Sequence, residues 1–104
     1  MLTPNVNTIE HVPARNWESW RDDNDAVVVD VREPAEWLSG TLPGSLTIPL
    51  SKLPEAASTM DTTVPILVVC AHGVRSVTAV AWLSSMGFEK AASMAGGVVA
   101  LGYR

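Results

Sequence analysis

The sequence predicts an α/β domain, because short buried strands alternate along it with helical patterns. Residues 26–31 (AVVVDV) and 65–70 (PILVVC) are apolar, largely β-branched runs without polar alternation, which is typical of strands buried on both faces of a parallel sheet. A length of 104 residues suits one core, and no linker or repeat divides the chain. We therefore expect residues 1–104 to form a single domain.

The first predicted helix covers residues 14–23. Pro13 precedes it, and proline is tolerated at a helix start because the N–H that it lacks has no helical partner there. Trp17 and Trp20 lie three residues apart, so they share one helical face and are expected to pack in the core.

The remaining elements follow from shorter patterns. Residues 33–39 and 51–58 predict brief helices, and residues 76–86 predict a longer helix that ends at Gly87. Weaker strand patterns and turn-rich segments complete the prediction, with strands at residues 45–48 and 90–94 and turns at residues 40–44 and 95–97.

Composition argues against several classes of protein. With 47% hydrophobic and 17% charged residues the chain is too apolar for intrinsic disorder, and a net charge of −4 without a basic cluster argues against nucleic-acid binding. The longest apolar runs, residues 64–71 and 94–102, are far shorter than the ~18–20 residues of a membrane-spanning helix. Residues 1–7 show no leader pattern, and the single cysteine, Cys70, cannot form an internal disulfide. We expect a cytoplasmic protein.

The segment with chemical interest is residues 70–76 (CAHGVRS), which follows a buried-strand pattern and leads directly into a helical one. In parallel sheets, ligands gather beyond the carboxyl ends of strands, where a helix N-terminus presents free N–H groups. A tight loop with inward-pointing amides binds anions and stabilises a cysteine as its reactive thiolate. Gly73 would permit such a turn, and Arg75 would add positive charge.

Simpler interpretations of this segment stay open. Cys70 could be an ordinary buried cysteine, since free cysteine is among the most buried residue types. The polar loop, its glycine and the arginine before a helical pattern favour a functional cysteine instead. His72 could adjust the thiolate or contact substrate, or it could be an exposed histidine without a catalytic task. No metal site is expected, because Cys70 and His72 supply only two ligands and His11 is remote in sequence.

Four ordered motifs give the sequence a resemblance to the rhodanese-like family over most of its length. They are DVREPAEW (30–37), GTLPGS (40–45) followed by IPL (48–50), CAHGVRS (70–76) and GGVVAL (96–101). The resemblance implies a central parallel β-sheet flanked by α-helices in three layers, with an active loop of six residues that begins at the cysteine. Thr41 stands where this family often has histidine, and Leu101 where it often has tryptophan.

The resemblance also implies roles for individual residues. Cys70 would be the nucleophile that carries sulfur as a persulfide. The rest of the loop would form the substrate-binding cradle, which comprises Ala71, His72, Gly73, Val74, Arg75 and Ser76. Asp30, Arg32 and Glu36 fit as a supporting polar cluster, although plain surface ion pairing explains them equally well.

The implied activity is sulfur transfer. The Cys70 thiolate would attack the outer sulfur of an anionic donor such as thiosulfate, and cyanide or a thiol would then accept that sulfur, without any cofactor. A protein could also serve as sulfur donor or acceptor. No nucleic acid or membrane partner is expected.

Two rival functions remain. One is a cysteine-dependent phosphatase or arsenate reductase, whose loop is one residue longer between cysteine and arginine. Here only residues 71–74 separate Cys70 from Arg75, which favours sulfur transfer. The other rival is a catalytically silent rhodanese-like module for binding or regulation, against which the intact cysteine argues.

Overall fold

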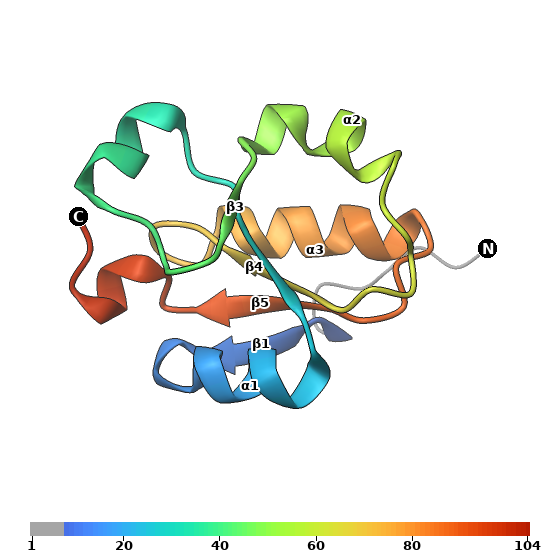
Figure 1. Cartoon of the computed structure of the whole chain (residues 1–104), viewed down its shortest axis with the longest axis horizontal. Coiled ribbons are helices and arrows are strands. Elements are labelled where there is room, and N and C mark those ends of the chain that lie inside the picture. The colour runs from blue at the N-terminus through green and yellow to red at the C-terminus, as the bar shows by residue number, and fades with distance from the viewer. Residues whose placement is uncertain (1–7) are drawn as a thin grey trace.

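A five-stranded parallel sheet forms the centre of the protein in a computed structural model that describes residues 8–104 (Figure 1). The strands are β1 (Glu10–Pro13), β2 (Val27–Asp30), β3 (Leu46–Thr47), β4 (Ile66–Val69) and β5 (Ala91–Ala95). They lie in the order β1-β5-β4-β2-β3, and every neighbouring pair is parallel. The expected α/β class is therefore confirmed, and the carboxyl ends of the strands share one edge of the sheet. The expectation about a leader concerns residues 1–7, which lie outside the described part of the chain.

Helices cover both faces of the sheet and make the three expected layers. The α-helices are α1 (Trp17–Asn24), α2 (Leu53–Ala57) and α3 (Arg75–Ser85), and short 3-10 helices span Ala14–Asn16, Pro34–Ser39, Leu50–Lys52 and Val98–Leu101. Figure 1 shows α2 and α3 on one side of the strands and α1 on the other. Within residues 8–104, no helix is long and apolar enough to cross a membrane.

Successive residues of the central strands supply two separate hydrophobic clusters. Val29 and Val68 belong to the cluster that includes Leu83 of α3, whereas Val28 and Leu67 belong to the cluster that includes residues of α1. All four strand residues are at most 3% exposed. The absence of polar alternation in these runs thus reflects burial on both faces, as expected.

The N-terminal region differs most from the sequence prediction. Strand β1 is not predicted by any pattern, because it is a four-residue edge strand that exposes Glu10 and His11 and is recognisable only by its pairing with β5. The predicted helix at residues 14–23 begins as a 3-10 turn before α1. Trp17 is buried in the core, but Trp20 is only half-buried, and its indole N–H donates to Glu10 Oε2 at 2.7 Å.

Candidate active site at the carboxyl edge of the sheet

Cys70 lies immediately after β4 and begins the loop that leads into α3. Its residue surface is 1% exposed, and its Sγ accepts hydrogen bonds from the backbone N–H groups of Gly73 at 3.1 Å and Ser76 at 3.3 Å. Two amides aimed at one sulfur atom stabilise negative charge on it, because charge-assisted hydrogen bonds are stronger than neutral ones. The loop is thus built to hold a thiolate or the anion derived from it.

The sharp turn of the loop depends on Gly73, whose φ is +91°. A Cβ atom at this position would lie 3.1 Å from the backbone nitrogen of Gly96, in the turn that follows β5. Glycine satisfies both the left-handed conformation and the close approach of the two turns.

A second segment supports the loop from the end of β5. The N–H of Val98 donates to the Cys70 carbonyl at 2.9 Å, and the N–H of Val99 donates to the Ala71 carbonyl at 3.1 Å. At Gly97 a Cβ atom would lie only 2.1 Å from the Ala71 carbonyl oxygen. The motif at residues 96–101 therefore contributes to the site, a contribution that the sequence patterns do not reveal because these contacts are tertiary.

Two buried serines lie beneath the thiol. Ser76 Oγ is 3.5 Å from Cys70 Sγ and 2.7 Å from Ser93 Oγ, and both serines are fully buried. Ser76 belongs to the predicted cradle, whereas the sequence predicts Ser93 only as part of a strand. The sequence feature that could have indicated Ser93 is its hydroxyl group, the single one in the otherwise apolar strand β5.

Arg75 points to a carboxylate outside the loop. Its Nη1 lies 2.7 Å from Glu36 Oε1 and its Nη2 lies 2.9 Å from Glu36 Oε2, which is a bidentate ion pair. The hydrogen bonds from Arg75 lower the pKa of Glu36 to about 2, and the Glu36 carboxylate raises the pKa of Arg75. A negative charge on Cys70 would raise the pKa of Arg75 as well.

Asp30 and Arg32 form a buried pair that holds the segment bearing Glu36. Arg32 Nη2 lies 2.8 Å from Asp30 Oδ2, and both residues have no exposed surface. Arg32 also donates to the carbonyl oxygens of Glu36 at 3.1 Å and Gly40 at 2.8 Å. The interpretation of Asp30 and Arg32 as a surface ion pair is therefore wrong, because Asp30 ends β2 inside the protein and Arg32, two residues later, is also fully buried.

The other loop side chains differ in exposure. Ala71 is buried, His72 is exposed, and Val74 is 73% exposed. No group of three or more His, Cys, Asp or Glu side chains that could hold a metal ion occurs in the described residues.

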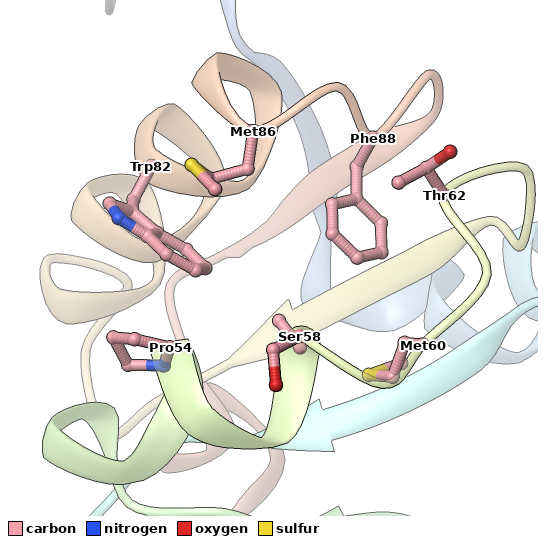
Figure 2. Close-up of a pocket in the computed structure, with 8 residues that line it drawn as sticks. Pro54, Ser58, Met60, Thr62, Trp82, Met86 and Phe88 are labelled. Atoms are coloured by element: carbon pink, nitrogen blue, oxygen red, sulfur yellow. The ribbon is translucent and has the colours of Figure 1, made fainter.

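A separate pocket lies between α2 and α3. Its volume is about 360 Å³, and it is lined by Pro54, Ala57, Ser58, Met60, Thr62, Trp82, Met86 and Phe88 (Figure 2). None of these residues belongs to the loop at residues 70–76, so the pocket is not part of the thiol site.

The site defines a class of protein: a parallel α/β domain with a buried cysteine in an anion-binding loop between a strand and a helix. Comparison with known proteins agrees. The rhodanese-like domain family matches residues 14–102, and the chain belongs to that family.

Relatives and solved structures support the same assignment. A thiosulfate sulfurtransferase GlpE of Pseudoalteromonas translucida is 34% identical over 79 residues, which cover 76% of this chain and 75% of that protein. A sulfurtransferase of Allochromatium vinosum is 32% identical over 79 residues, covering 76% and 74%. A rhodanese-like domain protein from Staphylococcus aureus has a TM-score of 0.81 at 26% identity, covering 92% of this chain and 94% of that one. These likenesses support sulfurtransferase activity in general.

Proposed function

We propose that the protein transfers a sulfane sulfur from an anionic donor such as thiosulfate to a thiophilic acceptor, cyanide or a thiol, and carries it on Cys70 as a persulfide. The observation that carries this proposal is the pair of amides of Gly73 and Ser76 on Cys70 Sγ. They can stabilise the attacking thiolate and then the persulfide anion, so the reaction needs no separate general base. The remaining amides of residues 71–76 would surround the donor.

The transfer is a displacement at sulfur. The Cys70 thiolate forms a bond to the outer sulfur of thiosulfate, the sulfur–sulfur bond of the donor breaks, and sulfite leaves with that electron pair. The acceptor then attacks the outer sulfur of the Cys70 persulfide, and the Cys70 thiolate leaves. Because Cys70 is 1% exposed, a donor that presents a terminal sulfur atom suits the site better than a crowded phosphate ester.

The two buried serines can hydrogen-bond to Cys70 both as a thiol and as a thiolate. With a thiol at Cys70, the S–H can point toward Ser76 Oγ, as in the structure. With a thiolate, the Ser76 hydroxyl can rotate to donate to Sγ while Ser93 donates to Ser76. We assign Ser76 and Ser93 as positioning residues for the charged sulfur. A reducing cytoplasmic setting would keep the Cys70 thiol unoxidised between cycles.

Intact mass spectrometry after exposure to thiosulfate tests the proposal. We expect the wild-type protein to gain the mass of one sulfur atom, to lose it on addition of cyanide, and to form thiocyanate catalytically. The Cys70→Ser variant should keep its fold, gain no sulfur and form no thiocyanate, since no other cysteine exists in the chain.

The same measurements distinguish the rivals. A wild-type protein that gains no sulfur from any sulfane donor would contradict the proposal and favour a silent binding module. Hydrolysis of an aryl phosphate at a rate comparable to sulfur transfer would instead favour phosphatase chemistry.

A further inference from the structure

The one arginine beside Cys70 has its charge compensated by a carboxylate. Arg75 is the only arginine or lysine in residues 70–76, and the Glu36 carboxylate holds both of its terminal nitrogens. Glu33 lies close enough for its charge to raise the pKa of Arg75 too. Arg32 adds no free positive charge, because it is fully buried against Asp30. A donor at the loop therefore meets backbone amides but no uncompensated cationic side chain among these residues.

This balance has unequal consequences for donors of different charge. A dianion is attracted to a free guanidinium much more strongly than a monoanion is, whereas a neutral ion pair favours neither strongly. The negative charges of the thiolate and of Glu33 repel a dianion more. The pair between Arg75 and Glu36 is thus expected to disfavour doubly charged donors specifically.

Three apolar side chains are exposed on the segments around the loop. Val74 in the loop is 73% exposed, and Leu38, two residues after Glu36, is 90% exposed. Val99, whose N–H binds the Ala71 carbonyl, is 40% exposed. Figure 1 shows the three segments that carry these residues at the same end of the molecule, beyond the carboxyl ends of the strands. Exposed apolar side chains here suit an uncharged organic group on the donor.

We propose that the site selects monoanionic sulfane-sulfur donors that carry an uncharged organic group, and that Glu36 sets this selectivity by compensating the charge of Arg75. This inference rests on the proposed sulfur transfer through Cys70 and narrows its donor class. Glu36 acts through Arg75, so it is a positioning residue that does not itself contact the reacting sulfur.

Methanethiosulfonate and thiosulfate make a matched pair of probes, since a methyl group replaces one charged oxygen. With methanethiosulfonate, the Cys70 thiolate bonds to the terminal sulfur, the donor's sulfur–sulfur bond breaks, and methanesulfinate leaves with the electron pair. One negative charge on each reactant becomes one on each product. With thiosulfate the same step releases the sulfite dianion.

The experiment measures the rate constant of Cys70 persulfide formation with each donor, by quenched mass spectrometry at fixed pH and ionic strength. The decisive quantity is the ratio of the methanethiosulfonate rate to the thiosulfate rate in each variant, because comparing ratios between variants cancels the intrinsic reactivity of the donors. Glu36→Gln keeps a side chain that can bind Arg75 but removes the compensating charge. Glu89→Gln removes one exposed carboxylate in the turn before β5, at the opposite edge of the sheet, and is the matched control.

We expect Glu36→Gln to accelerate thiosulfate loading, and the ratio of rates to fall about tenfold, the size of one charge-assisted hydrogen bond. Glu89→Gln should leave the ratio unchanged. The double variant Glu36→Gln/Arg75→Ala should lose the gain, because the gain requires the freed guanidinium.

A Glu36→Gln ratio equal to that of the wild type would overturn the inference, and so would a gain that persists without Arg75. Both outcomes leave sulfur transfer intact, since sulfur still loads on Cys70. Failure of the wild-type protein to load sulfur from either donor would contradict the proposed function itself.

Discussion

The turn after β5 can approach the cysteine loop closely because Gly97 has no side chain. At Gly97 the backbone has a φ of +65°, and the space that a Cβ atom would need is occupied by the Ala71 carbonyl. The hydrogen bonds from Val98 and Val99 to the carbonyls of Cys70 and Ala71 depend on this approach. The geometry of the cysteine loop therefore depends on the absence of a Cβ atom at Gly97.

Substitution of Gly97 tests this dependence. We expect Gly97→Ala to lower the free energy of unfolding by about 2 kcal/mol or more, because it adds a backbone clash to an unfavourable φ, and to slow sulfur loading of Cys70. Gly87→Ala is the matched control, since Gly87 also has a positive φ of 97° but no atom within 4 Å of the position that its Cβ atom would occupy. Urea unfolding and loading rates check both variants. A Gly97→Ala protein as stable and as reactive as Gly87→Ala would contradict the argument.

At the scale of elements, the 3-10 helix at Pro34–Ser39 follows β2 and contacts the cysteine loop through the ion pair between Glu36 and Arg75. Its start is fixed by Pro34 and by a capping box in which Glu36 Oε1 accepts the Glu33 N–H at 2.9 Å. Arg32 donates a hydrogen bond to the backbone carbonyl of Glu36, and the Glu36 carboxylate forms an ion pair with Arg75. The segment thus positions one carboxylate for two tasks, capping its own helix and compensating the loop arginine.

The pKa of Glu36 gives this element a defined pH dependence. Because the folded-state pKa is about 2, below the ordinary value of 4.5, the Glu36 carboxylate stabilises the fold fully above pH 4.5, and this stabilisation is lost as the pH falls toward 2. The side chains of Arg75 and Glu36 are 35% and 31% exposed, so solvent screening limits the effect to about 1 kcal/mol.

Urea unfolding of the wild type and Glu36→Gln between pH 7 and pH 2.5 measures this dependence. The difference in the free energy of unfolding should be largest near neutral pH and should shrink below pH 4.5. Glu89→Gln provides the baseline for loss of an exposed carboxylate. A difference between wild type and Glu36→Gln that is independent of pH would show that the ion pair does not stabilise the fold.

At the scale of the whole molecule, the two hydrophobic clusters share their central strands. β2 and β4 send alternate side chains into both clusters, so neither face of the sheet can unfold and leave the other intact. Tryptophans lie on both sides of the sheet: Trp17 and Trp20 belong to α1, and Trp82 belongs to α3. The arrangement predicts one cooperative unit rather than two.

We expect one unfolding transition for the chain, with coincident midpoints from far-UV circular dichroism and tryptophan fluorescence. In the double variant Trp37→Phe/Trp82→Phe, the remaining fluorescence comes from Trp17 and Trp20 on the α1 side, and it should still change at the midpoint seen by circular dichroism for that variant. Separate midpoints would indicate that the two faces unfold independently and would contradict the single-domain proposal.

Elements with local signals could be predicted from the amino-acid sequence. The apolar runs became β2 and β4, the patterns near residues 33–39, 51–58 and 76–86 became helical, and the cysteine loop lies at the predicted junction of strand and helix. Such features depend on the periodicity and turn chemistry of neighbouring residues, which a sequence displays directly.

The contacts between distant residues at the site could not be predicted in this way. Arg75 and Glu36 are 39 positions apart, and Ser76 and Ser93 are 17 apart, yet each pair is in direct contact. Strand β1 likewise exists only through its pairing with β5. The physical reason is that the order of strands in the sheet determines which segments become neighbours, and therefore whether the charge of Arg75 faces the donor freely or is compensated by a carboxylate.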